Sequence, residues 1–181
     1  MSEIVLLMEG FGNNIFITAL SVIFPILIGI LLTFIASKSK IAESVFSWLS
    51  MPFECICPVL LLITVYYLIP YVFDLGINEI IKYVVIIVSF TTCFLFYMPA
   101  RFVKSDSFLK NTLVNGIGLI SAVFKWSFCL SFIGFLDLTR ASQNIMAKYY
   151  NPLILLIPFA VSVLTLFVLE LIKRFIKQFM K

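Results

Sequence analysis

The chain has 181 residues, of which 62% are hydrophobic and only 12% are charged, and its net charge is +4. Soluble domains are about 45–50% apolar and about 25% charged, and a globule of this size could not hide so much apolar surface from water. The apolar runs are continuous, which excludes a β-barrel because its strands alternate between apolar and polar residues. We therefore expect an all-α, polytopic membrane protein that forms a single domain over residues 1–181.

In chain order, the apolar runs approach or exceed the roughly 20 residues that a helix needs to cross the hydrocarbon core. They predict about five transmembrane helices. The first twelve residues hold Glu3 and Glu9 but no Lys or Arg, so they lack the basic region of a signal peptide. We therefore expect the first span to be retained. The predicted spans are residues 14–36, 45–70 (beginning at Val45 or at Phe53), 80–98, 113–135 and 152–172.

Basic residues predict the orientation, because Lys and Arg in short loops stay cytoplasmic. If the chain crosses the membrane five times, most of the basic residues fall on the side of the C-terminus, and Lys82, Arg140 and Lys148 fall on the other side. We expect a multi-pass protein of the cell (inner or cytoplasmic) membrane with its N-terminus outside and its C-terminus in the cytoplasm. The net positive charge then reflects topology in the lipid bilayer, and we expect no binding to nucleic acid. The basic residues of the cytoplasmic side are Lys38, Lys40, Arg101, Lys104, Lys110, Lys173, Arg174, Lys177 and Lys181.

The residue inventory argues against an enzyme. The chain has no histidine, and most general-base and triad mechanisms use one. It also lacks the Gly-x-x-x-x-Gly-Lys loop that binds nucleotide phosphates. The four cysteines lie in or beside apolar runs without the four-ligand pattern of structural zinc. We expect no catalytic residue, no metal and no cofactor.

A few polar residues within the spans are candidates for a solute pathway. Lys125 falls inside the fourth predicted span, where a charge is costly and usually faces a cavity or a partner. It either lines a pathway or extends its amine to the membrane interface. The hydroxyl residues either join helices to each other or contribute to the same pathway. These hydroxyl candidates are Ser127, Ser131, Thr64, Ser89 and Thr92.

The stretch from Asp137 to Gln143 is typical of a helix start, in which Asp137 or Thr139 caps the free N–H groups. We expect a short helix up to Tyr150 on the outer surface, with Tyr149 and Tyr150 at the membrane interface. Ser131-Phe-Ile-Gly-Phe-Leu-Asp-Leu-Thr-Arg-Ala-Ser-Gln143, followed by a proline-led last span and a basic tail, resembles the end of polar amino-acid ABC transporter permeases. Thr18-Ala-Leu-Ser-Val, Gly29-Ile-Leu-Leu, Ser37-Lys and the stretch 58–70 are similar to earlier parts of that family.

This resemblance implies the fold of a type I ABC importer permease core. It also implies a permease subunit that moves a small polar solute, an amino acid, by ATP-driven alternating access. The implied partners are ATP-binding cassette ATPase subunits, a second permease subunit (identical or different) and an extracytoplasmic solute-binding protein. The residues that match the family motif are Gly134, Asp137, Thr139, Arg140 and Gln143.

One part of the chain departs from the family. The Glu-Ala-Ala loop that couples these permeases to their ATPase is absent, and residues 101–112 take its place. We expect a coupling helix reduced to residues 105–113, or weaker contacts with the partner. Two other functions stay open on this ground, a non-transporting membrane assembly protein and a small channel. The candidates for coupling are Arg101, Lys104, Ser105, Asp106 and Lys110.

Overall fold

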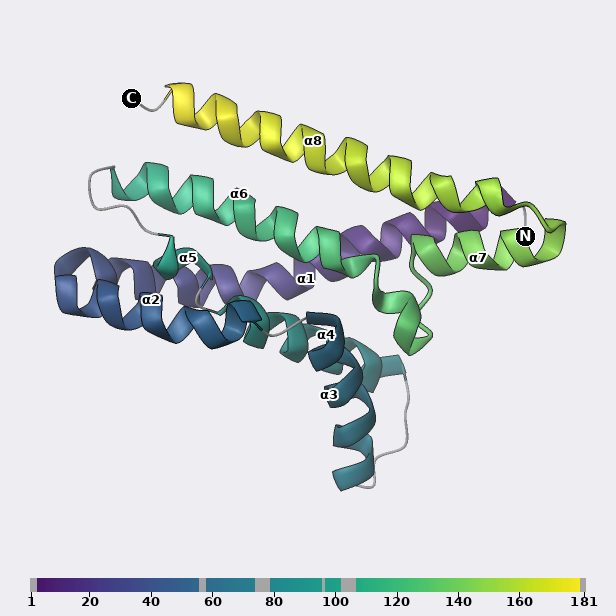
Figure 1. The fold of residues 1–181 in the computed structure, drawn as a ribbon, viewed down its shortest axis with the longest axis horizontal. Helices are drawn as coiled ribbons and strands as arrows, with labels where there is room; N and C mark the ends of the chain where they lie inside the picture. The colour runs from purple at the N-terminus through teal and green to yellow at the C-terminus, as the bar shows by residue number, and fades with distance from the viewer. Residues whose placement is uncertain (1–2, 56–57, 74–78, 96, 102–106, 180–181) are drawn as a thin grey trace.

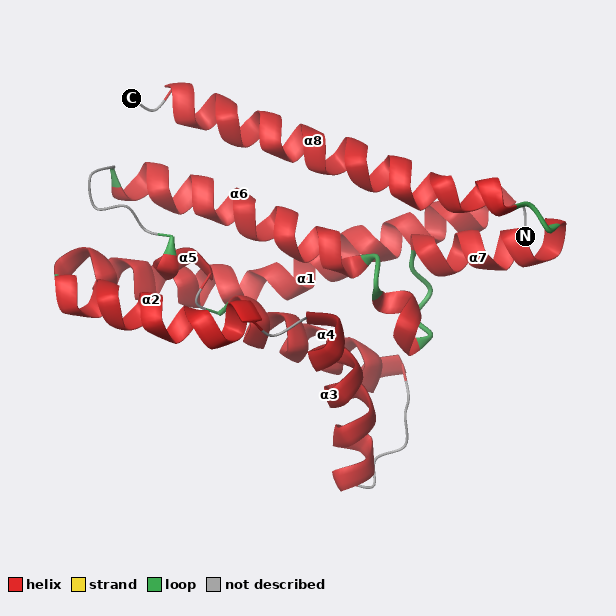
Figure 2. Ribbon diagram, in the orientation of Figure 1, coloured by secondary structure: helices red, strands yellow, loops and turns green. Residues whose placement is uncertain are grey.

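The computed structural model describes residues 3–55, 58–73, 79–95, 97–101 and 107–179. Every regular element in these ranges is a helix (Figure 2). This confirms the predicted all-α class. The Lys104, Ser105 and Asp106 candidates lie outside the described residues.

Helix α1 (Glu3–Lys38) is the element around which the others pack. It contacts α6 (Phe108–Ser127), α4 (Glu79–Phe94), α7 (Leu138–Tyr149) and α5 (Tyr97–Ala100). The last helix, α8 (Leu156–Phe179), packs mainly on α6 and runs alongside it in Figure 1. The remaining elements are α2 (Lys40–Cys55), α3 (Pro58–Phe73) and the 3-10 turns η1 (Leu130–Ile133) and η2 (Pro152–Leu155).

The buried face of α1 consists mostly of small and polar residues together with Ile17 and Val22, whereas many of its large apolar side chains point outward. The buried positions recur every three or four residues, which is one stripe of a helix. Small side chains allow close approach of neighbouring helices in a membrane, where lipid solvates the apolar outer face. The buried small and polar residues include Gly10, Asn14, Thr18, Ser21, Gly29, Thr33 and Ala36, and the exposed apolar ones include Phe16, Ile23, Phe24, Leu27 and Leu31.

Within the described part of the chain, three helical stretches are long and apolar enough to cross a membrane. They are Glu3–Lys38, Ile80–Ala100 and Pro152–Phe179. They correspond to the first, third and fifth predicted spans. Helix α1 has 36 residues, a length of roughly 54 Å, so it extends beyond the roughly 30 Å hydrocarbon core.

The other two predicted spans need correction. With its start at Val45 the second predicted span is divided between α2 and α3, whereas with its start at Phe53 it falls mostly on α3. Pro58 is the first residue of α3, a position where proline's missing N–H does no harm. The predicted span 113–135 ends early, because α6 stops at Ser127 and the chain turns through η1. Helix α6 begins at Phe108, so residues 108–113 are its first turns and do not form a separate coupling helix.

Candidate functional site

A buried set of hydrogen bonds joins α1 to the ends of α6 and α7. The Asn14 amide nitrogen donates to the Ser127 hydroxyl oxygen at 2.9 Å, and the Asn14 amide oxygen accepts from the Leu138 N–H at 2.8 Å. Asn14 and Ser127 are completely buried. Polar groups at such sites need partners, because an unpaired one costs about 1–3 kcal/mol. We call this set, together with Asn13 and Asp137, the polar joint.

Asp137 holds the motif segment in its shape. One carboxylate oxygen accepts from the Arg140 N–H at 2.7 Å, which caps α7, and the other accepts from the Ser131 N–H at 3.2 Å. Of the two capping candidates, Asp137 is therefore the cap, whereas the Thr139 hydroxyl donates to the Phe128 carbonyl at 2.9 Å. Burial raises the pKa of the Asp137 carboxyl to about 6, although the backbone N–H groups act in the opposite direction.

Two positions at and against the motif segment favour glycine. Gly134 ends η1 with φ of 73°, in the left-handed region, where other residues are strained. Gly10 of α1 lies directly against the start of α7, since a Cβ there would be 2.7 Å from the Asp137 carbonyl oxygen. Arg140 is exposed and Gln143 is partly buried. Among the motif residues, Gly134 and Asp137 therefore shape the turn between η1 and α7.

The pathway candidates do not converge on one place. Lys125 is in the last turn of α6 rather than mid-helix, and its side chain is exposed, with the amine 5.8 Å from the Trp126 ring. Ser127 belongs to the polar joint, and Ser131 lies next to it in η1. The others are on α3 (Thr64, exposed) and on α4 (Ser89 and Thr92).

The hydroxyls of α4 bond within their own helix. Ser89 donates to the Val85 carbonyl at 2.7 Å and Thr92 to the Val88 carbonyl at 2.8 Å, the i−4 pattern typical of Ser and Thr in helices. Ser127 is different, because its hydroxyl also accepts a hydrogen bond from α1. Among these three residues, the expected role in joining helices therefore fits Ser127.

The described coupling candidates lie at the junction of α5 and α6. The Arg101 guanidinium stacks over the Tyr97 ring at 3.9 Å, and the Arg101 carbonyl accepts from the Asn115 amide at 3.1 Å. Lys110 lies in the first turn of α6, where its N–H donates to the Ser107 hydroxyl that caps the helix. Lys110 is therefore at the opposite end of α6 from Ser127 of the polar joint.

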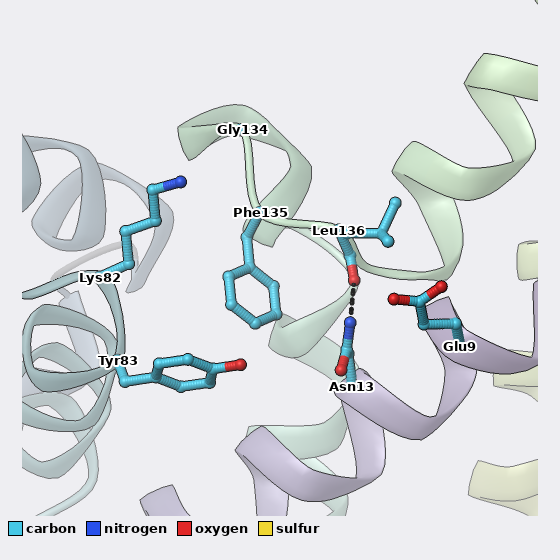
Figure 3. A pocket seen from close by; sticks show the side chains of 7 residues that line it. All are labelled: Glu9, Asn13, Lys82, Tyr83, Gly134, Phe135 and Leu136. Atoms are coloured by element: carbon cyan, nitrogen blue, oxygen red, sulfur yellow. Dashed lines mark hydrogen bonds between the residues drawn. The ribbon is translucent and has the colours of Figure 1, made fainter. Parts of the chain in front are cut away.

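A polar cavity of about 300 Å³ opens beside the polar joint (Figure 3). Glu9 and Asn13 reach it from α1 and Lys82 and Tyr83 from α4, and the third wall is the loop 134–136. The Asn13 amide nitrogen donates to the Leu136 carbonyl at 2.8 Å. The Tyr83 and Phe135 rings meet edge to face, with centroids 5.4 Å apart. In the described residues no cluster of three or more His, Cys, Asp or Glu side chains is placed to hold a metal ion.

Sequence reasoning missed Gly10, Asn13 and Asn14. Their signal is the run Gly10-Phe-Gly-Asn-Asn14, in which two glycines and two asparagines interrupt an otherwise apolar sequence. Polar residues within membrane helices usually face the protein interior. Such a run predicts a packed, hydrogen-bonded face, but its partners around Asp137 lie more than a hundred residues away along the chain.

No known protein-family profile matches the sequence, and no curated protein matches it. Among solved structures, the chain is similar to one in a crystal structure of an amino acid ABC transporter with histidines. The alignment covers 96% of this chain and 93% of that chain at 18% sequence identity, with a TM-score of 0.74. The chain shares its fold with an ABC transporter. The predicted fold class is therefore confirmed along nearly the whole length of the chain.

Proposed function

We propose that the chain is the membrane-spanning permease subunit of an ABC importer for a small polar solute, most specifically an amino acid. The observation that carries this proposal is the shared fold over 96% of the chain. The motif segment supports it, because Gly134, Asp137 and Thr139 each fill a defined structural role at the corner before α7. The permease itself performs no covalent chemistry, and ATP is hydrolysed by a separate partner chain.

The arrangement of helix ends supports the proposed orientation, N-terminus outside and C-terminus in the cytoplasm. In Figure 1 the C-terminal ends of α1 and α8 and the start of α6 lie at one end of the molecule. This end carries Lys38, Lys110 and Lys177. The N-terminus and α7 lie at the opposite end. Lys and Arg concentrate on the cytoplasmic side of membrane proteins, so the ATPase subunits would meet the end that carries these lysines.

The proposed assembly has a second permease subunit, two ATPase subunits and an extracytoplasmic solute-binding protein. In this assembly we propose that Arg101 and Lys110, the coupling candidates that the structure describes, lie near the ATPase. Lys125, Ser127, Ser131, Thr64, Ser89 and Thr92 remain the proposed pathway candidates, and Lys104, Ser105 and Asp106 the remaining coupling candidates.

Copurification tests the proposal. The full-length chain, expressed with a P-loop ATPase encoded beside it, should elute with that ATPase. Photo-crosslinkers placed one at a time from Arg101 to Leu113 should capture it. Absence of any ATPase contact across this range would refute the coupling role.

A second function, a non-transporting assembly protein, is favoured by one observation. The chain lacks the Glu-Ala-Ala sequence in the region that would contact an ATPase. The two functions differ in reconstituted vesicles. A permease changes solute-stimulated ATP hydrolysis when pathway candidates are substituted, whereas an assembly protein leaves it unchanged. A small channel would instead give solute flux without ATP.

A further inference from the structure

A second cavity, almost entirely apolar, lies between α1, α6 and α8. Helix α6 packs on both α1 and α8 (Figure 1), and the cavity of about 410 Å³ opens where these two helices flank it. The Thr18 hydroxyl at its wall donates to the Asn14 carbonyl at 2.7 Å. The Thr165 hydroxyl donates to the Val161 carbonyl at 2.9 Å. Both hydroxyls are therefore used inside their own helices, and the space suits an apolar occupant. We call this cavity the apolar groove, and its walls are Ile15, Thr18, Ala19, Val22, Ile120, Phe124, Thr165 and Leu169.

Open space continues along α6 beyond the groove. Gly116 is buried and precedes Ile120 by four residues, so the two residues lie on the same side of the helix. A Cβ at Gly116 would nevertheless meet nothing within 4 Å, whereas close-packed interiors leave few such voids. The space therefore extends from Ile120 toward the end of α6 that carries Lys110.

Positive charge lies beyond the groove along α8. Lys173 follows Leu169 by four residues and Lys177 by eight, which is roughly 6 Å and 12 Å along the helix axis. Glu170 pairs with Lys173 at 3.4 Å and with Arg174 at 3.7 Å. One acidic residue thus faces three basic ones, and positive charge is in excess at this end of α8.

We infer that the apolar groove holds one acyl chain of an anionic phospholipid, whose phosphate lies at Lys173 and Lys177. Half of the hydrocarbon core is about 15 Å thick. Thr165 precedes Lys173 by eight residues, or roughly 12 Å, so a chain anchored at Lys173 reaches the full length of the groove along α8. A basic residue near the membrane surface contributes about fivefold to the affinity for an anionic lipid.

Helix α8 has contacts to gain from such a lipid. Of its residues, all of which the structure describes, only Pro158 is buried. An acyl chain in the groove fills the space between α8 and α1 and adds contacts on both. The choice of leaflet rests on the proposed function: in the proposed orientation the lysines of α8 are cytoplasmic, and the cytoplasmic leaflet is the one that carries anionic lipid.

Native mass spectrometry of the purified chain in detergent tests the site without any ATPase. The first probe is dioleoylphosphatidylglycerol, and dioleoylphosphatidylcholine has the same chains but no net charge. Dihexanoylphosphatidylglycerol and inorganic phosphate carry the charge without a long chain. We expect one molecule of the first probe bound to each chain, with at least about fivefold higher affinity than the second and no retention of the last two.

Substitutions separate the headgroup contact from the chain contact. Lys173→Gln and Lys177→Gln should each weaken phosphatidylglycerol binding about fivefold and leave phosphatidylcholine binding unchanged. Ala19→Leu places a larger side chain in the groove and should weaken the binding of both lipids at least about fivefold. The matched controls are Lys148→Gln at the end of α7 and Ala160→Leu at an exposed position of α8 outside the groove, and neither should change either affinity.

Four results would overturn the inference: no lipid retained, equal affinity for the two dioleoyl lipids, retention of phosphate as strong as that of the lipid, or binding that none of the three test substitutions weakens. A dimer that excludes lipid and is lost in Ala19→Leu would also overturn it, because a second copy would then cover the groove. Lys177 is exposed, so Lys177→Gln keeps the test decisive even where Ala19→Leu does not fold.

The proposed function fails separately. If the lipid binds as expected but no ATPase associates with the chain, the lipid site holds and the permease role is wrong. If ATP-driven uptake occurs with a chain that retains no lipid, the permease role holds and the lipid site is wrong.

Discussion

The close approach of Gly10 to the start of α7 gives the sharpest stability prediction. In Gly10→Ala the new Cβ would lie 2.7 Å from the Asp137 carbonyl oxygen, whereas ordinary contact begins at 3.4 Å. The backbones of α1 and of the start of α7 must therefore move apart by about 0.7 Å. Overpacking of this kind costs about 1–3 kcal/mol. The retreat also strains the 2.8 Å hydrogen bond from the Leu138 N–H to Asn14.

Gly12 is the matched control on the same helix. A Cβ at Gly12 meets nothing within 4 Å, so Gly12→Ala gains only the helix propensity of alanine, about 1 kcal/mol. Since Gly10→Ala receives the same gain, the two variants differ by the cost of the contact alone. Thermal unfolding in nanodiscs should place the Tm of Gly10→Ala below that of Gly12→Ala, by about 2–4 °C for each kcal/mol. Equal or reversed Tm values would refute the packing of α7 against α1.

Three further predictions concern the polar joint and the proposed coupling end. Asn14→Leu should destabilise the fold by about 2–4 kcal/mol and Ser127→Ala by about 1–3 kcal/mol. The double variant should cost measurably less than the sum in a chemical unfolding assay, because the two share a hydrogen bond. Asp137 has a folded-state pKa of about 6 against 3.8, so its contribution to stability is full below about pH 4 and falls as the pH rises through 6, by about 3 kcal/mol in total. Unfolding of Asp137→Asn should lack this dependence, and identical pH profiles would contradict the assigned burial. A photo-crosslinker at position 110 should capture the ATPase and one at position 148 should not; capture at 148 alone would reverse the proposed orientation.

Composition and apolar run length were sufficient to predict an all-α membrane protein, because both depend on the solvent around the chain and not on its tertiary contacts. The fourth span shows where run length fails. The apolar sequence continues to Phe135, yet α6 ends at Ser127 and the chain turns through η1 to Gly134. An apolar residue is compatible with a helix or a buried turn, so hydropathy alone could not distinguish them.

The candidate site was predicted only in part. Asp137 was among the residues recognised as a helix cap, because a cap is a local feature that sequence spacing reveals. The polar cavity was not predicted, because Glu9, Lys82 and Phe135 come together only when α1, α4 and the loop before α7 pack. For Lys125 the sequence left two roles open, a pathway lining and an amine at the membrane interface, and its exposed position in the last turn of α6 is compatible with the second.

ATP-dependent uptake tests the central claim most directly. The chain would be reconstituted in proteoliposomes with the proposed ATPase, partner permease and solute-binding protein, and uptake of radiolabelled amino acids would be measured with and without ATP. The account predicts uptake that requires both ATP and this chain. Uptake that persists without this chain, or flux that proceeds equally without ATP, would contradict it.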